Sequence, residues 1–286
     1  MGDDNNGDDE MSFLSRTKKL TATDPPRILI YGEAGIGKTS LAAEFPHPYY
    51  LMIENGQNDT LENLGVEGLD RREVQTFGDV CEVMRELYET ETHHRTFVLD
   101  SLSALQTMIY EEVCARGDEH GNPRNRIQDF KYGNGYVNAM NVWIEFVTCM
   151  DMLRLDRGMT IVLIAHANIT RFDDPETVSY SKYELDLHHS EKVSARKLIE
   201  KEMDAILLLK KDVSTKQENP NVKGGRVIPE SANIFIHAQS KAAFIAKSRY
   251  GIPAKLVYRP GNGYAELAKY LPGHTVPAQP AADAAK

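Results

Sequence analysis

The segment YGEAGIGKTS, residues 31–40, holds three glycines, a lysine and a threonine at a spacing suited to phosphate chemistry. Gly32, Gly37, Lys38 and Thr39 match the pattern G-x-x-x-x-G-K-[ST]. Glycines let the backbone turn so that several N–H groups point at phosphate oxygens, the lysine reaches the β- and γ-phosphates, and the threonine hydroxyl ligates Mg²⁺. The alternative is a glycine-rich turn that holds no ligand.

The residues around this segment support the phosphate-binding interpretation. Residues 27–32, RILIYG, predict a buried strand, and residues 38–45, KTSLAAEF, predict the start of a helix. We therefore expect ATP and Mg²⁺ as cofactors, with Thr39 and Asp100 as the metal ligands. The expected cofactor-binding residues are Gly32, Glu33, Ala34, Gly35, Ile36, Gly37, Lys38, Thr39, Ser40 and Asp100.

Asp100 is expected to be the second anchor for the metal. It ends RTFVLD, residues 95–100, and the carboxyl ends of parallel strands are where α/β sheets bind ligands. Its carboxylate would hold the Mg²⁺ shell through water. An aspartate at this position can instead serve only as a cap for the helix that starts at Ser101.

Hydrolysis needs a group that orients or deprotonates water, and Glu54 is the leading candidate. It ends YYLMIE, a predicted strand whose carboxyl end would face the same crevice. Ser101 follows Asp100 directly, at a position where many ATPases carry a glutamate. Asp59 is a weaker candidate, and the alternative for Glu54 is a surface carboxylate before a turn.

Length, charge and composition predict one main domain of ordinary globular type. The chain has 286 residues and a formal charge of −9, and MGDDNNGDDE supplies five of its acids, so global charge says little about partners. No segment resembles a signal peptide or a membrane span, which predicts a cytoplasmic protein without a membrane partner. Three scattered cysteines predict reduced thiols rather than a disulfide framework.

Short β-rich segments alternate with helical patterns, which predicts an α/β fold with a mostly parallel sheet that ends in antiparallel strands. Residues 1–24 and 271–286 are expected to be flexible tails, since they cannot bury a core, and residues 25–270 form the predicted main domain. Helices are predicted at residues 78–90 and 136–155. The predicted strands cover residues 27–32, 49–54, 73–77, 95–100, 160–166, 204–210, 233–239 and 242–248.

With Glu54 after one strand, Asp100 after another and His166 at the end of TIVLIAH, the pattern resembles the RecA superfamily of ATPases. The resemblance covers about residues 25–260. Within the superfamily, the chain resembles most the phage-encoded RecA-like ATPases that act in single-strand annealing or recombination. This resemblance implies a RecA-like P-loop NTPase core, single-stranded DNA and a single-strand-binding protein as partners and, for a phage-encoded chain, the cytoplasm of the host. It also implies that His166 is a γ-phosphate sensor, at a position where RecA itself has glutamine. A satisfied core histidine is the alternative.

Two polar segments are candidates for the DNA contact that the resemblance implies. Residues 168–202 lie where RecA-like proteins place a DNA-binding loop, and residues 115–136 form a second basic, Gly-rich stretch. Basic side chains would meet phosphates and tyrosines would stack on bases, and a solvated loop is the alternative for either segment. The candidates are Arg171, Tyr180, Lys182, Tyr183, Lys192, Arg196 and Lys197 in the first segment, and Arg116, Arg124, Arg126, Lys131 and Tyr132 in the second.

Residues 246–251, AKSRYG, resemble the K-N-R-F-G motif of bacterial RadA proteins, with Ser and Tyr in place of Asn and Phe. In RecA-like assemblies, basic residues in this region reach the γ-phosphate bound by the neighbouring subunit. The resemblance implies that Lys247 and Arg249 act in trans as catalytic residues and that the chain forms a head-to-tail ring or filament. Paired basic residues on a solvated edge strand are the alternative.

Two other function classes stay open at this point: a phosphoryl transferase for a small molecule, and an ATP-driven regulatory or packaging motor without annealing activity. The histidine pairs at 93–94 and 188–189 suggest metal binding, which the sequence does not favour. Adjacent side chains point apart, and no third ligand is evident at a suitable spacing.

Overall fold

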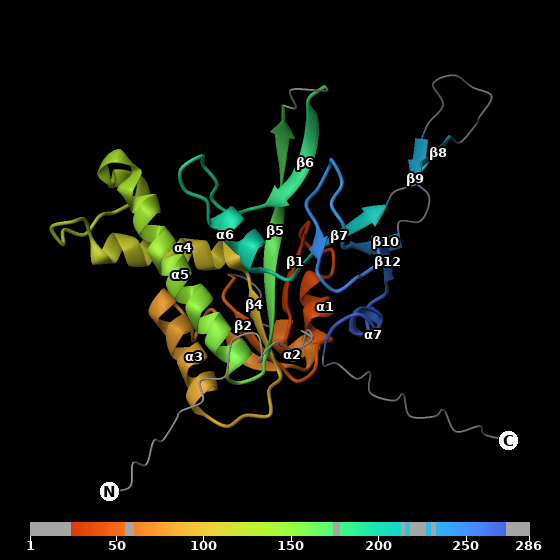
Figure 1. Cartoon of the computed structure of the whole chain (residues 1–286), viewed down its shortest axis with the longest axis horizontal. Coiled ribbons are helices and arrows are strands. Elements are labelled where there is room, and N and C mark those ends of the chain that lie inside the picture. The colour runs from red at the N-terminus through yellow and green to blue at the C-terminus, as the bar shows by residue number, and fades with distance from the viewer. Residues whose placement is uncertain are drawn as a thin grey trace, which may run out of the picture.

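A ten-stranded mixed sheet forms the centre of the molecule (Figure 1). The computed structural model describes residues 24–54, 60–173, 178–212, 215–217, 227–229 and 233–272. The parallel strands are β1 (Arg27–Gly32), β2 (Pro48–Met52), β3 (Glu67–Asp70), β4 (Thr96–Asp100), the first half of β5 (Thr160–Phe172) and β7 (Ala205–Asp212). The antiparallel strands are β6 (Tyr180–Leu185), β10 (Asn233–His237), β11 (Lys247–Ser248) and β12 (Lys255–Tyr258), and β8 (Thr215–Gln217) pairs separately with β9 (Val227–Pro229).

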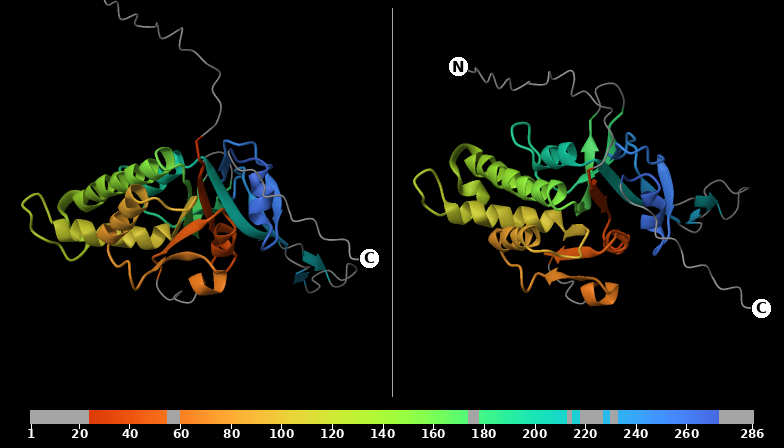
Figure 2. Two further views of the ribbon diagram at one scale, coloured as in Figure 1. Left: turned by 90° about the horizontal axis from the view of Figure 1, so that it is seen from below. Right: turned by 60° about the horizontal axis from the view of Figure 1, so that its bottom comes forward.

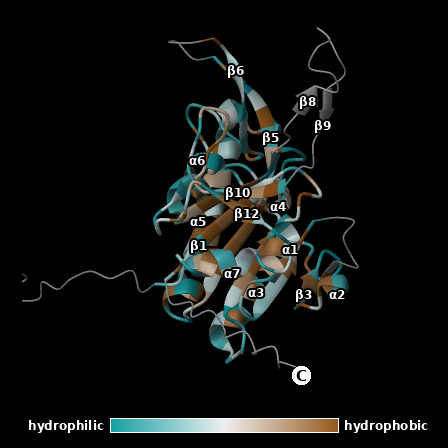
Figure 3. Ribbon diagram, turned by 90° about the vertical axis from the view of Figure 1, so that its right-hand side faces the viewer, coloured by the Kyte–Doolittle hydropathy of each residue, from teal (hydrophilic) through white to brown (hydrophobic). Residues whose placement is uncertain are grey.

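The strand order β12-β10-β7-β1-β5-β4-β2-β3 puts β1 near the middle of the sheet. Every residue of β1 and of β4 is buried, as expected for parallel strands that are covered on both faces. Alternate residues of β1 enter two different cores, Leu29 and Tyr31 on one face and Ile28 and Ile30 on the other. Figure 3 shows these hydrophobic strands at the centre of the molecule.

Helices cover both faces of the sheet (Figure 2). One face packs against the helices α3 (Phe77–Glu89), α4 (Leu102–Arg116), α5 (Asn134–Leu155) and α6 (Ala195–Glu202). The other face packs against α1 (Lys38–Ala43) and α7 (Gly263–Ala268), and α2 (Thr60–Leu64) lies beside β3. Two short 3₁₀ turns, Ile127–Asp129 and Lys131–Gly133, connect α4 to α5. The predicted α/β fold with a mostly parallel sheet and C-terminal antiparallel strands is therefore confirmed.

The strand predicted at residues 73–77 is wrong. This segment is a turn followed by the start of α3, where the Thr76 side chain accepts from the Asp79 N–H and the Asp79 carboxylate accepts from the Thr76 N–H. This capping box fixes the helix start and outweighs the local β propensity. The strand is instead β3, where Gly68 lies so close to β2 that a Cβ would come within 1.9 Å of the Tyr50 carbonyl oxygen.

The strand predicted at residues 242–248 is also only partly present. Lys247 and Ser248 pair with β7 as β11, whereas residues 240–246 form a turn closed by the Ser240 hydroxyl, which accepts from the Ala246 N–H and donates to the Ala246 carbonyl. The antiparallel edge of the sheet is completed by β10 and β12.

Residues 168–172 and 180–185, which belong to the segment 168–202 that was expected to form a polar loop, form two paired strands instead. The second half of β5 leaves the central sheet after His166 and pairs with β6 from Ala167 to Phe172. This β5–β6 arm extends beyond the rest of the sheet at the top of Figure 1. It places Arg171, Tyr180, Lys182 and Tyr183 on paired strands.

Several expectations concern residues outside the described ranges. They include Asp59 and nearly all of the two predicted tails, residues 1–23 and 273–286. Within the described ranges, no helix combines the length and apolar composition that a membrane crossing requires.

Candidate nucleotide-binding site

The phosphate loop, residues 32–39, connects the end of β1 to the start of α1. Gly32 packs against β7 so closely that a Cβ would lie 2.5 Å from the Leu209 carbonyl oxygen. Gly37 has a φ of 103° and is the N-cap of α1, a backbone conformation that L side chains rarely adopt. The two glycines are therefore required by the backbone, as the motif predicts.

Lys38 is only 6% exposed, and its ammonium group donates to the carbonyl oxygens of Gly32 (3.1 Å) and Glu33 (2.9 Å). Burial lowers the pKa of Lys38, while the charges of Asp100 and Glu54 act in the opposite direction. A buried ammonium that has carbonyls as its direct hydrogen-bond partners suits an anionic ligand, because phosphate oxygens would supply stronger, charge-assisted hydrogen bonds. The donor set of the loop therefore fits a nucleotide phosphate.

Thr39 and Asp100 meet at the expected metal position. The Thr39 hydroxyl donates to Asp100 Oδ2 at 2.8 Å, and Asp100 is 2% exposed at the carboxyl end of β4. Burial raises the pKa of Asp100 to about 6, since desolvation disfavours the carboxylate. A hydroxyl and a buried carboxylate beside a phosphate loop are the oxygen ligands that Mg²⁺ prefers. The N-cap of α4 is Ser101, whose side chain accepts from the Ala104 N–H, so Asp100 does not cap that helix.

Glu54, two residues after the end of β2, and His166 of β5 face each other at this edge of the sheet. His166 Nε2 lies 2.9 Å from Glu54 Oε1 and 3.0 Å from Oε2. The hydrogen bond from His166 lowers the pKa of Glu54, and the same contact raises the pKa of His166. Ser101 also hydrogen-bonds Glu54, so the serine that replaces the expected glutamate helps to hold the carboxylate.

The β5–β6 arm is connected to this site at its base. His166 pairs with Gly32 in the central sheet and is followed directly by the arm. The Asp186 N–H donates to the His166 carbonyl at 3.0 Å, and the Tyr183 hydroxyl donates to Glu33 in the phosphate loop at 3.3 Å. Sequence reasoning missed this contact between Tyr183 and Glu33, because 150 residues separate them and no local pattern signals it.

Two tyrosines complete the back of the site and were also missed. Tyr50 donates to the Thr39 carbonyl at 2.8 Å, and Tyr258 lies 3.4 Å from the Gly37 carbonyl. Glu44 ties the C-terminal segment to this region by accepting from the backbone N–H groups of Gly261 and Tyr264. The C-terminal segment therefore packs against the phosphate loop and α1.

Comparison with known proteins is consistent with this geometry. A family model described as an AAA domain matches residues 24–250, which is most of the chain. The chain belongs to the AAA domain family. It is also 25% identical over 146 residues, 49% of its length, to the SPbeta prophage-derived uncharacterized protein YorG of Bacillus subtilis (strain 168). The match covers 40% of that relative, so the chain spans less than half of its length.

Membership of this family supports the prediction of a P-loop ATPase. This AAA domain is of the P-loop ATPase type, in agreement with its fold and its phosphate loop. Family membership does not by itself indicate a RecA-like recombination protein. Action on DNA and the predicted partners stay predictions.

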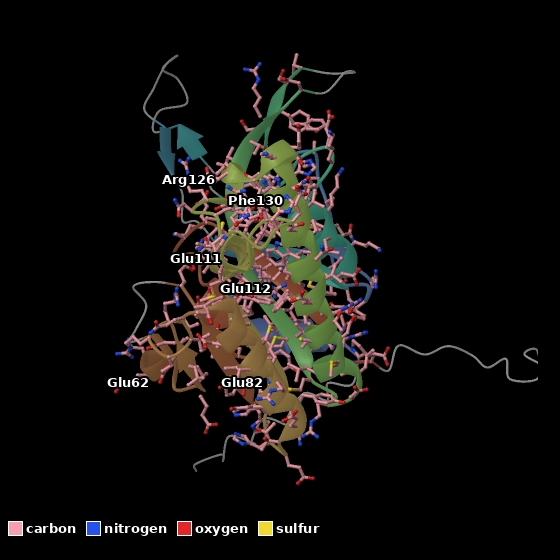
Figure 4. All side chains as sticks on the ribbon, turned by 90° about the vertical axis from the view of Figure 1, so that its left-hand side faces the viewer. Glu62, Glu82, Glu111, Glu112, Arg126 and Phe130 are labelled. Carbon is pink, nitrogen blue, oxygen red and sulfur yellow. The ribbon has the colours of Figure 1, made fainter. Side chains whose placement is uncertain are left out.

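The second predicted DNA segment of the AAA domain holds arginines that already have acidic partners. Arg116 contacts Glu112 and Glu145, Arg124 contacts Asp118, and Arg126 contacts Asp129. Figure 4 shows this face, with Arg126 and Phe130 above the two acids Glu111 and Glu112. Tyr132 is 98% exposed, and it lines a cavity of about 320 Å³ together with Lys131 and Asp118.

The first predicted DNA segment is divided between the arm and α6. Arg196 is half-buried and pairs with Glu184, whereas Lys192 and Lys197 are exposed. On the arm, Lys182 lies over the ring of Phe172, and Phe172 and Tyr180 face each other with ring centroids 5.4 Å apart. The remaining arm residue, Arg171, is exposed and lies 3.4 Å from Asp173.

Lys247 and Arg249, the residues expected to act in trans, contact their own chain. Lys247 donates to the Glu200 carbonyl at 2.7 Å, and Arg249 contacts Asp204 Oδ1 at 2.7 Å. Both lie near the amino end of β7, whereas the phosphate loop lies at the carboxyl edge. Neither residue therefore belongs to the phosphate site of the same molecule.

Proposed function

We propose that this AAA domain hydrolyses ATP with Mg²⁺ and couples hydrolysis to binding of single-stranded DNA, as in the phage recombination and annealing ATPases that it resembles. One observation carries the proposal: His166 contacts the candidate catalytic Glu54 and is also the last residue before the β5–β6 arm. The same residue can therefore report the state of the phosphate site to an element suited to nucleic acid.

The residues of the chain have separate roles in hydrolysis. Bound Mg²⁺-ATP would supply the scissile phosphoanhydride bond. Lys38 and the loop N–H groups would hold its phosphates, and Thr39 and Asp100 would hold the metal shell. Glu54 would orient the attacking water and accept its proton, since its carboxylate is ionised at neutral pH. His166 orients both oxygens of that carboxylate.

The described part of the arm offers an aromatic platform for bases. Phe172 is 40% exposed, and Tyr180 and Lys182 lie beside it. Aromatic side chains of this kind stack on bases of any sequence, and a neighbouring lysine attracts the backbone phosphates. The acids on the arm favour stacking over a broad basic surface as the source of affinity.

The test is a titration of labelled single-stranded DNA at several salt concentrations, combined with ATPase assays. Phe172→Ala and Tyr180→Ala should each weaken DNA binding by about tenfold, the cost of one lost stacking contact. Ile169→Ala is the matched control, because Ile169 is 55% exposed on the same arm but cannot stack on a base. DNA should also stimulate ATP hydrolysis. Lys38→Ala should abolish hydrolysis while leaving the structure of the arm intact.

Other outcomes separate the competing functions. Unchanged DNA binding in both arm variants, with loss in variants of Lys131 and Tyr132, would move the DNA contact to the segment between α4 and α5. Absence of DNA binding at low salt would contradict the proposal. Phosphorylation of nucleosides would then indicate a small-molecule transferase, and stimulation by a protein would indicate a regulatory or packaging motor.

A further inference from the structure

The loop before β4 brings two histidines and a glutamate together on the edge of the molecule away from the phosphate loop. His93 Nε2 lies 3.4 Å from Glu67 Oε2, and His94 Nε2 lies 3.3 Å from the same oxygen. All three ligand atoms lie within 4.8 Å of one another. The sequence does not favour a metal here, because adjacent side chains were expected to point apart.

The backbone explains why these adjacent side chains converge. Residues 91–95 form a loop rather than a strand, so their side chains do not alternate between two faces. The Arg95 N–H donates to the His47 carbonyl at 3.0 Å, which fixes the loop against the chain before β2. The two imidazole rings consequently lie with centroids 4.3 Å apart.

The third residue comes from the neighbouring strand. Glu67 begins β3 and pairs with Tyr49 of β2, whose ring packs edge-on against His94. The side chain of His94 is 9% exposed, and backbone groups of His47 and Pro48 interact with its ring. Its Nε2 lies 3.3 Å from Glu67, which is long for a charge-assisted hydrogen bond. The Nε2 lone pair is therefore available to a metal, while backbone contacts orient the ring.

The distances suit shared coordination better than hydrogen bonding. A tetrahedral Zn²⁺ with bonds of about 2.0–2.1 Å places neighbouring ligand atoms about 3.3–3.5 Å apart. The two measured nitrogen–oxygen distances fall in this range. Two imidazoles and one carboxylate are also a ligand set typical of zinc and related transition metals.

We propose that His93, His94 and Glu67 bind a transition-metal dication of the Zn²⁺ class, with a fourth coordination position left to water or to the nearby His47. The ring of His47 lies 6.0 Å from that of His93, centroid to centroid. The metal would join the amino ends of β2, β3 and β4, at the edge of the sheet opposite the phosphate site. It would act on stability rather than on hydrolysis.

The test is calorimetric titration of the full, untagged chain with Zn²⁺ in the absence of nucleotide, followed by Co²⁺ absorption spectroscopy. Wild-type protein should bind one equivalent at this site, show the ligand-field bands of tetrahedral Co²⁺ and unfold at a higher temperature with Zn²⁺. Glu67→Gln and His93→Ala should each weaken binding at least about tenfold. Both residues are exposed, so both variants should fold.

Two controls make the result decisive. His120→Ala removes another exposed imidazole that faces a carboxylate, Glu119, at 3.7 Å, and it should leave binding unchanged. Asp100→Asn removes any Zn²⁺ held at the phosphate site, and it should leave the Glu67-dependent equivalent in place. No saturable binding, or binding that both Glu67→Gln and His93→Ala retain, would overturn the proposal. Because the readout needs no nucleotide, its failure leaves the proposed ATPase untouched.

Discussion

The contact between Glu54 and His166 determines what the site can do at the scale of single residues. A carboxylate that acts on water must be ionised and correctly oriented, and His166 meets both requirements by facing the two carboxylate oxygens within 3.0 Å. Glu54 is 27% exposed, so water can also reach it. The pair is therefore accessible, as the proposed role requires, rather than buried in the core.

Glu54→Gln should keep ATP affinity and lose hydrolysis, because the amide keeps the size and hydrogen bonding of the side chain but cannot accept a proton. ATP affinity is measured by fluorescence titration and turnover by phosphate release. Lys38→Ala is the comparison, since it should lose affinity as well. Wild-type turnover in Glu54→Gln would assign the base to another residue, with Asp59 the next candidate.

The titration of His166 should reveal the same contact. Its pKa is raised by Glu54, so Glu54→Gln should lower the pKa of the His166 imidazole in an NMR titration. His188, whose pKa is lowered by burial, is the internal control and should not change.

The sign of the linked stability follows from the raised pKa. The contact stabilises the fold fully below the unfolded-state pKa of about 6.5, and this stabilisation is lost as pH rises through the raised pKa of His166. Glu54→Gln should therefore cost more unfolding free energy at pH 5.5 than at pH 8.5. An equal cost at both values would contradict an ionic pair.

At the residue level, the sequence indicated positions where a motif or a strand end fixed them. The phosphate-loop pattern gave Gly32, Lys38 and Thr39, and the rule that parallel strands end at one edge gave Asp100, Glu54 and His166. The structure brings these side chains to one edge of the sheet, and their catalytic roles stay predictions. The direct contact between Glu54 and His166, and the cluster of Glu67 with His93 and His94, could not be predicted, because both depend on which strands are neighbours and on the path of a loop.

At the scale of elements, long apolar segments were predictable and short edge elements were not. The helices predicted at 78–90 and 136–155 correspond to α3, whose apolar periodicity is strong, and to α5, which is long and rich in apolar residues. The strand β3 was missed, since EGLD has one large apolar residue and a glycine that is needed only because β2 approaches it closely. The arm was missed because its segments, NITRF and YSKYEL, mix polar and apolar residues without regular alternation and carry little periodic signal.

A buried charge cluster joins several elements at the amino ends of β1 and β7. Asp204, 3% exposed, accepts from the Arg27 N–H at 3.0 Å, and it also contacts the guanidinium groups of Arg249 and Arg154. Burial opposes ionisation, but the Arg27 N–H and the nearby guanidinium groups outweigh it and lower the pKa of Asp204. The amino ends of β1 and β7 and the end of α5 depend on this one carboxylate.

Asp204→Ala should lower the free energy of unfolding by about 3 kcal/mol, because it leaves buried arginine charge without its central partner. Urea unfolding followed by circular dichroism measures the change. Glu82→Ala is the matched control: Glu82 also pairs with an arginine, Arg85, but the pair is exposed, so the cost should stay below about 0.5 kcal/mol. Equal costs in the two variants would show that the cluster is not structurally important.

At the scale of the whole molecule, the nucleotide site and Arg249 lie at opposite edges of one sheet. Asp204, which contacts Arg249, lies five residues before Leu209, and Leu209 pairs with Gly32 of the phosphate loop. At about 3.3 Å per residue, Asp204 and Leu209 are separated by roughly 17 Å along the strand. Arg249 therefore cannot reach the phosphates held by its own chain, and any catalytic role requires a neighbouring subunit. A head-to-tail ring or filament would supply that geometry.

Mixing two inactive variants tests this action in trans. Arg249→Ala and Lys38→Ala subunits should each be inactive alone, because an arginine that stabilises transition-state charge contributes on the order of a thousandfold and the phosphate loop cannot bind ATP without its lysine. Together they should recover partial ATPase activity, since some mixed interfaces pair an intact phosphate loop with an intact Arg249. Phosphate release is measured in the mixture after assembly is verified by light scattering.

The position of Arg249 beside Asp204 makes a second measurement necessary. If Arg249 serves only its own fold, Arg249→Ala should lower the unfolding free energy, and no mixture should recover activity. Arg249→Lys separates the two roles, because lysine keeps a cation beside Asp204 but lacks the planar fork that contacts phosphate oxygens in two places. We expect Arg249→Lys to keep most of the stability and to lose most of the ATPase activity, and its mixture with Lys38→Ala to recover activity as the alanine variant does. Full activity in Arg249→Lys, or no recovery in either co-assembled mixture, would assign Arg249 to the buried charge cluster alone.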